Sequence, residues 1–150
     1  MVFFELEILM GYFTLFFISF FAATILPVSS ELTLLGMVST KTYSIFLLFL
    51  FASLGNILGS CVNWYLGIHF IKFKNKKWFP FSDKQIQKSS FWFNKYGQWS
   101  LLLAWVPFFG DPLTFVAGTL KTNFFKFLLL VSIGKSTRYF ILIYLLNYTS

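Results

Sequence analysis

Charged side chains are scarce in this sequence of 150 residues: only 11% are Asp, Glu, Lys or Arg, and 57% are hydrophobic. These residues provide too little polar surface to cover a water-soluble globule of this length. The composition therefore predicts an integral membrane protein. The single cysteine, Cys61, excludes an intrachain disulfide. The single histidine, His69, has no other metal-ligating side chains near it, so we expect neither a metal site nor a cofactor.

Catalytic groups are equally scarce. A hydrolase needs a nucleophile beside a base, and the sequence places no serine or cysteine to partner His69. The acids Glu31 and Asp111 could form a carboxylate pair for acid–base chemistry, but nothing in the sequence adds a cofactor or a metal to them. We therefore do not expect an enzyme.

Four apolar blocks occupy most of the chain, at residues 8–40, 43–71, 99–120 and 123–146. A membrane span needs roughly 20 predominantly apolar residues, so no room is left for a separate soluble domain. We predict one membrane domain over residues 1–150. It consists of a first half at 1–71, a basic loop at 72–98 and a second half at 99–150.

The basic loop carries nearly all of the net charge. It contains seven lysines and one acid, Asp83, which gives it +6 of the chain's +7. Lysines that flank membrane spans are ordinarily cytoplasmic and contact anionic lipid head groups, so we favour this reading over a nucleic-acid partner. Within the loop, Ser82 and Gln85 form a weak capping box before an amphipathic helix that would lie in the membrane interface.

The first and third apolar blocks share a pattern. Glu31 follows Pro27 by four residues, and Asp111 follows Pro107 by four residues. These two acids are the only ones inside the apolar blocks, and each lies beside helix-breaking residues. Matching interrupted segments in two halves of a chain indicate an internal repeat with a central site.

The third block is too interrupted to form one span. Pro107, Gly110 and Pro112 divide it into two short helices, which predicts a re-entrant hairpin. Irregular backbone inside a membrane must be buried in protein or line a wet cavity, so both hairpin turns should face inward. The first turn would comprise Pro27, Ser29 and Ser30.

The predicted fold is therefore all-α, with two inverted units. Each unit is a re-entrant broken hairpin followed by a full transmembrane helix, and both termini lie outside. The sequence leaves one alternative open: if residues 8–26 cross completely, the amino terminus lies in the cytoplasm.

The two full spans carry further signals. Gly55, Gly59, Asn63 and Gly67 recur every four residues and predict a helix-packing face, with Asn56 and Asn63 as candidate polar lining. In the last span, Lys135 and Arg138 lie three residues apart and therefore share one face.

Four buried charges demand an explanation, because each costs roughly 2.5 to 3.5 kcal/mol near the centre of a membrane helix. In one interpretation, Glu31 and Asp111 neutralise Lys135 and Arg138 as a static clamp. In the other, which we favour, the cations hold an anionic head group in a hydrated pocket while a carboxylate gains and loses a proton.

Several segments of this chain resemble one known family. The residues that carry the resemblance are Pro27 with Glu31, Gly55 with Asn56, Tyr96-Gly97, Gly110-Asp111-Pro112, Gly118, and Gly134-Lys135 through Arg138, within "LPVSSELTLLG", "GNILGSCVNWYLG", "FWFNKYGQWSLLLAWVPFFGDPLTFVAGTLK" and "FLLLVSIGKSTRYFIL". They are similar to the DedA family of membrane proteins, also called the SNARE-associated or VTT-domain superfamily, and to its small YqaA-like branch in particular.

The resemblance implies two facing re-entrant loops and lipid transport or scrambling. In some bacterial members it implies translocation of a polyprenyl-phosphate carrier with dependence on the proton gradient. The larger members resemble one another in having arginines around the proline of the second loop, where this chain has Ala104 and Gly110, and their first acid follows its proline more closely. Lys135 and Arg138 would then supply the missing positive charge.

The sequence therefore predicts a transporter or scramblase for an anionic lipid or its head group. We expect it in the bacterial plasma (inner) membrane with the lysine loop in the cytoplasm, as a monomer or an oligomer. Expected partners are membrane lipids, with polyprenyl phosphate and phospholipid head groups as candidates. The alternatives are a small-ion or proton-coupled transporter for membrane homeostasis, and a structural or assembly protein with a static charge clamp.

Overall fold

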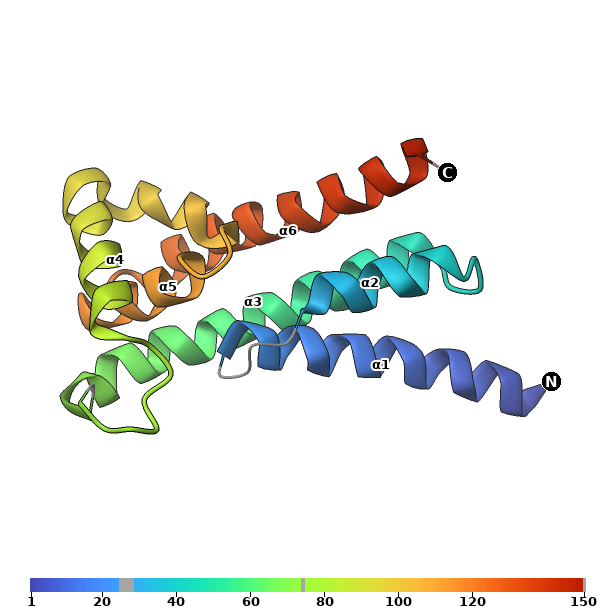
Figure 1. Cartoon of the computed structure of the whole chain (residues 1–150), viewed down its shortest axis with the longest axis horizontal. Coiled ribbons are helices and arrows are strands. Elements are labelled where there is room, and N and C mark those ends of the chain that lie inside the picture. Colours follow the sequence, from blue (N-terminus) through green and yellow to red (C-terminus); the bar gives the residue numbers. More distant parts are fainter. Residues whose placement is uncertain (25–28, 74, 150) are drawn as a thin grey trace.

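The computed structural model describes residues 1–24, 29–73 and 75–149, and every regular element in these residues is a helix (Figure 1). The elements in chain order are α1 (Val2–Thr24), α2 (Ser30–Ser39), α3 (Ile45–Phe70), η1 (Ile71–Phe73), α4 (Asp83–Tyr96), η2 (Gly97–Trp105), α5 (Gly110–Thr119) and α6 (Phe124–Thr149). The prediction of an all-α protein is confirmed.

Three of these helices, α1, α3 and α6, are long and apolar enough to cross a membrane, by length and composition. At 1.5 Å per residue, the 26 residues of α3 and of α6 extend about 39 Å, which exceeds a bilayer core of about 30 Å. Together with the composition, they identify an integral membrane protein, as predicted.

Two antiparallel pairs of helices lie at opposite ends of the molecule (Figure 1). Both termini and the loop between α2 and α3 lie at one end, whereas α4 and the turn between α5 and α6 lie at the other (Figure 1). α1 runs from the first end toward the middle of the molecule, and α2 runs back to that end. η2 and α5 form a similar antiparallel pair at the second end. α3 packs against α1, α5 and α6, and therefore ties the two helix pairs together.

The second pair has the predicted break. η2, a 3₁₀-helix, ends at Trp105, and α5 begins at Gly110. Phe108 in the intervening turn has φ of 62°, in the left-handed region that side chains rarely adopt. A Cβ atom on Gly110 would lie 2.0 Å from the carbonyl oxygen of Ala104, so only glycine allows the turn to close this tightly.

The first pair differs from the second in length. α1 has 23 residues, whereas η2 has 9 and α5 has 10. The apolar run before Pro27 contains no charge or proline that would end a helix early. Its length fits the alternative that the sequence left open, in which residues 8–26 cross the membrane completely. Pro27 itself lies outside the described residues.

The small-residue stripe of α3 is a packing face, and it serves two neighbours. A Cβ atom on Gly55 or Gly59 would lie 2.2 or 2.6 Å from a backbone oxygen of α1, and one on Gly67 would lie 2.1 Å from the Phe115 oxygen of α5. Backbones approach this closely only where the side chain is absent, so the stripe fixes the positions of both helix pairs against α3.

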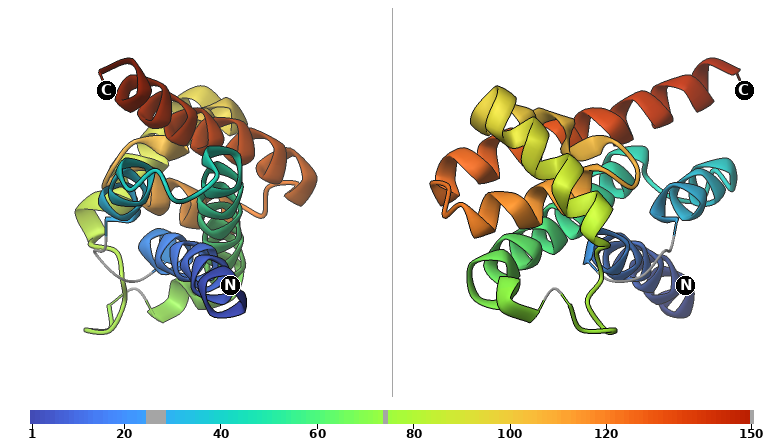
Figure 2. Two further views of the ribbon diagram at one scale, coloured as in Figure 1. Left: turned by 90° about the vertical axis from the view of Figure 1, so that its right-hand side faces the viewer. Right: turned by 60° about the vertical axis from the view of Figure 1, so that its left-hand side comes forward.

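Helix α4 crosses the long helices at the second end of the molecule (Figure 2). Its predicted capping box is present: the Gln85 amide donates to Ser82 Oγ at 3.2 Å, and the Ser82 amide donates to Gln85 Oε1 at 2.9 Å. α4 packs against α5 and η2, with Phe93 buried in the core there. Tyr96, the last residue of α4, is exposed.

Candidate functional site

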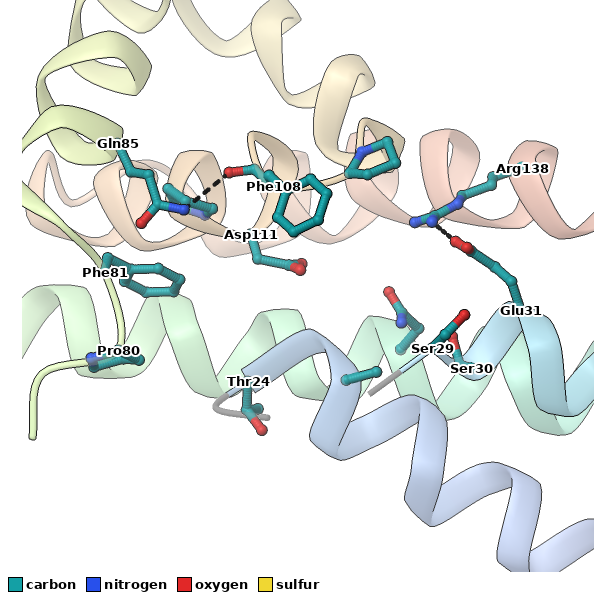
Figure 3. A pocket seen from close by; sticks show the side chains of 14 residues that line it. Thr24, Ser29, Ser30, Glu31, Pro80, Phe81, Gln85, Phe108, Asp111 and Arg138 are labelled. Atoms are coloured by element: carbon teal, nitrogen blue, oxygen red, sulfur yellow. Dashed lines mark hydrogen bonds and ion pairs between the residues drawn. The ribbon is translucent and has the colours of Figure 1, made fainter. Parts of the chain in front are cut away.

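A cavity of about 520 Å³ lies where the two helix pairs meet (Figure 3). Its wall combines residues from both pairs, from α3, from α6, and from α4 with the segment before it. The lining residues are Ala22, Thr24, Ser29, Ser30, Glu31, Asn56, Pro80, Phe81, Gln85, Pro107, Phe108, Asp111, Pro112 and Arg138. Polar and charged groups thus meet in a partly open cavity between largely apolar helices.

Lys135 of α6 forms the more deeply buried of two ion pairs. Its ammonium donates to Asp111 Oδ1 of α5 at 2.7 Å and to Asn56 Oδ1 of α3 at 2.5 Å. The Asn56 amide nitrogen in turn donates to the Ser19 carbonyl oxygen of α1 at 3.1 Å. This chain of contacts connects four helices, and every donor in it has a charged or carbonyl acceptor, as a buried ammonium requires.

Arg138, one helical turn further along α6, forms the second ion pair. Its Nη2 contacts Glu31 Oε1 in the first turn of α2, and both side chains lie on the cavity wall (Figure 3). Lys135 and Arg138 therefore have different acids as partners: one acid lies on α5 and the other on α2.

A neutral hydrogen bond lies beside this second pair. The hydroxyls of Ser30 and Tyr139 are 2.8 Å apart, and both side chains are buried. Ser29 caps α2 by accepting the Leu32 amide at 3.3 Å. The beginning of α2 is thus held on α6 by a contact that does not depend on charge.

The far side of the cavity is formed by the segment before α4 and by the turn before α5. The Gln85 side-chain amide donates to the Phe108 carbonyl oxygen at 3.3 Å, which joins α4 to this turn (Figure 3). Phe81 packs its ring against that of Phe115, with 5.5 Å between their centroids. Phe81 and Phe108 are thus the aromatic residues of the cavity wall, and Phe108 lies beside Asp111 (Figure 3).

The residues proposed from the sequence lie at several different places in the structure. Those that line the cavity are Ser29, Ser30, Glu31, Asn56, Pro107, Asp111, Pro112 and Arg138. Lys135 lies behind the wall and reaches it through Asp111. Gly55, Gly59 and Asn63 serve helix packing, and Gly110 closes the turn before α5. Pro27 lies outside the described residues.

Asn63 is the clearest case of a polar side chain used for packing. It is fully buried, and its amide nitrogen donates to the Ala23 carbonyl oxygen at 2.7 Å and to Thr114 Oγ1 at 3.2 Å. These bonds join α3 to α1 and α5 away from the cavity wall. Of the two asparagines proposed as polar lining, only Asn56 lies on the cavity wall.

Sequence reasoning missed several parts of the site. Tyr139 follows Arg138 directly, but no sequence pattern indicates that its hydroxyl forms a hydrogen bond with Ser30. Gln85 was recognised only as a capping residue, whereas its amide group also binds the turn at Phe108. Within the described residues, no three His, Cys, Asp or Glu side chains lie together as metal ligands would.

Comparison with known proteins supports a family assignment. The family model for the VTT domain matches residues 26–148. The inner membrane protein YqaA of Escherichia coli K12 is 35% identical over 127 residues, which cover 85% of this chain and 84% of YqaA. A protein of Haemophilus influenzae is 31% identical over 141 residues, which cover 87% of this chain and 84% of that protein.

A more distant relative has a name that states a substrate. Undecaprenyl phosphate transporter A of Staphylococcus aureus is 28% identical over 120 residues, which cover 73% of this chain and 59% of the transporter. No solved structure matches the chain.

Proposed function

The chain belongs to the VTT-domain family, also called the DedA family, and from this we propose that it moves an anionic lipid, or its head group, across the bacterial inner membrane. The cavity carries this proposal. A guanidinium and two carboxylates face a space of about 520 Å³ between apolar helices, which is large enough for a phosphate head group.

The cavity has two sides that suit the two parts of a lipid. Arg138 offers planar N–H donors that match phosphate oxygens, and Ser29 and Ser30 add hydroxyls nearby. Phe81 and Phe108 elsewhere on the wall are apolar and suit the first carbons of a lipid chain. A head group bound in this way would be shielded from the hydrocarbon while it crosses.

Proton coupling follows from competition for positive charge. An anion that binds the cation of an ion pair removes the partner of the carboxylate. A carboxylate without a partner in a poorly hydrated site binds a proton more readily, since burial disfavours its charged form. Substrate binding and protonation of Glu31 or Asp111 would then be linked.

The membrane arrangement that we propose consists of two inverted units. α1–α2 and η2–α5 would each be re-entrant from opposite faces, with α3 and α6 as the full spans of residues 1–71 and 99–150. The lysine-rich segment 72–98 would lie in the cytoplasm, where its charge contacts anionic lipids. The cavity between the hairpin turns would then lie within the bilayer.

Candidate substrates are polyprenyl phosphates and phospholipids. The named substrate of the Staphylococcus aureus relative favours the former class. Both candidates combine a phosphate group with one or two long apolar chains, which is the chemistry that the cavity suits.

A flip assay in reconstituted vesicles tests this proposal. The full chain would be incorporated into phosphatidylcholine vesicles with a trace of fluorescent lipid, either a phosphate monoester or phosphatidylcholine with the same label, and an external quencher would report lipids that cross. We expect faster crossing of the phosphate monoester than of the phosphatidylcholine. Crossing no faster than in protein-free vesicles, for both labels, would contradict the proposal.

A further inference from the structure

The two ion pairs of α6 differ in their access to the cavity, and this difference assigns them different tasks. The Lys135 side chain is 2% exposed and is absent from the cavity wall, whereas Arg138 is 21% exposed and lies on it. The acids are similarly exposed, at 31% for Asp111 and 28% for Glu31. The difference in access to the cavity between the two ion pairs therefore comes from the cations and not from the acids.

The hydrogen-bonding capacity of the cations points the same way. An ammonium has three N–H donors, and Lys135 directs two of them to Asn56 and Asp111. An anion that approached Lys135 would have to displace one of these partners from a buried position. A guanidinium has five N–H donors, of which one carboxylate occupies at most two in a bidentate pair, so Arg138 can bind a second anion.

Opening the Arg138 pair would not release α2. Ser30 of the same helical turn remains bonded to Tyr139 of α6, at 2.8 Å and away from solvent. Glu31 can therefore exchange with an incoming anion while the helix stays in place. Opening the Lys135 pair, by contrast, would break the hydrogen bond between α6 and α5 and leave the buried ammonium with Asn56 as its remaining partner among the described residues.

On the basis of the proposed function, we propose that Arg138 is the residue that binds the lipid phosphate and that Glu31 is the acid that the phosphate displaces. The hydrogen bonds of Lys135 with Asp111 and Asn56 stay in place during transport. They hold the helices around the cavity and do not exchange partners. The static clamp and the exchangeable pair, which the sequence presented as alternatives, would then both exist, one at each cation.

Glu31→Gln gives the sharpest test, because it predicts a gain. The full-length protein in detergent would be titrated by calorimetry with short-chain phosphatidic acid, and with the diacylglycerol of the same chains as the uncharged control. Since Glu31 competes with the phosphate for Arg138, Glu31→Gln should bind phosphatidic acid more tightly, by up to about fivefold. Arg138→Gln should bind it at least about tenfold more weakly.

Glu7→Gln is the matched control, because it makes the same substitution at an exposed acid that lies outside the cavity wall. We expect it to leave the affinity of the folded protein within about twofold of the wild-type value, a difference of about 0.4 kcal/mol. A gain in affinity for Asp111→Asn but not for Glu31→Gln would overturn the assignment. So would wild-type affinity in Arg138→Gln.

The same titration separates this inference from the proposed function. Binding of phosphatidic acid to the wild type that none of the variants alters would refute the role of Arg138 and leave lipid binding intact. Absence of binding to the wild type would refute both. Inorganic phosphate should bind more weakly than phosphatidic acid, and equal affinity would identify a free anion as the ligand and overturn the lipid part of the proposal.

Discussion

Neutralising the two acids of the site should affect stability unequally. Asp111→Asn leaves Lys135 charged and 2% exposed, with only neutral partners. Breaking a buried pair typically costs about 3 to 5 kcal/mol. The introduced amide oxygen can still accept a hydrogen bond, and Asp111 is itself partly exposed, so we expect a loss of roughly 2 to 3 kcal/mol in the free energy of unfolding.

Glu31→Gln should cost less, because both members of its pair are partly exposed. Pairs of this kind are worth about 0.2 to 1 kcal/mol. If 1 kcal/mol shifts Tm by about 2 to 4 °C in a chain of this length, Asp111→Asn should lower Tm by roughly 4 to 12 °C and Glu31→Gln by at most about 4 °C.

Thermal unfolding in one detergent, followed by tryptophan fluorescence, would measure both shifts. The double variant Asp111→Asn/Lys135→Gln provides the control, since it removes the stranded charge and should recover part of the loss. A Glu31→Gln variant that is destabilised as much as Asp111→Asn, or a double variant less stable than either of its single variants, would refute the distinction between the two pairs.

Three further predictions concern packing, hydrogen bonding and topology. Gly118→Ala should destabilise the protein by about 1 to 3 kcal/mol in thermal unfolding, because its Cβ would lie 2.0 Å from the Trp64 carbonyl oxygen. Gly36→Ala is the control, because a Cβ there would have nothing within 4 Å, and it should be neutral or stabilising by up to about 1 kcal/mol. A loss of stability in Gly36→Ala as large as that in Gly118→Ala would contradict this. Tyr139→Phe should cost about 1 to 3 kcal/mol by leaving the buried Ser30 hydroxyl without its partner, and an unchanged Tm would show that this bond contributes nothing. In a Cys61→Ala background, single cysteines at positions 3 and 149 should react with an impermeant thiol reagent added to intact cells, whereas one at position 76 should not, and labelling at 76 would reverse the orientation.

The sequence was most informative where charge or proline interrupts an apolar run. Glu31, Asp111, Lys135 and Arg138 stood out because an isolated charge in a membrane helix is expensive, and the structure places all four in two ion pairs at one cavity. The break before Asp111 was predictable because two prolines and a glycine fall within six residues.

The choice of partners could not be predicted. Lys135 and Arg138 share one helix face, so either acid could have paired with either cation on periodicity alone. The outcome depends on how α2 and α5 meet α6, which is a matter of tertiary packing. The same holds for the full length of α1, since a run without charges or breakers does not encode where a helix stops, and for Gln85, whose contact with Phe108 joins elements far apart in the chain.

Plugging the cavity tests the central claim most directly, namely that lipid head groups cross through it. Ala22 lines the cavity, whereas the neighbouring Phe21 is exposed on the outer face of α1. Ala22→Cys and Phe21→Cys, each in the Cys61→Ala background, would be labelled in detergent with a bulky maleimide, reconstituted and compared with their unlabelled forms in the flip assay. We predict that the label abolishes crossing of the phosphate lipid in Ala22→Cys and leaves it unchanged in Phe21→Cys. Undiminished crossing in fully labelled Ala22→Cys would contradict the account.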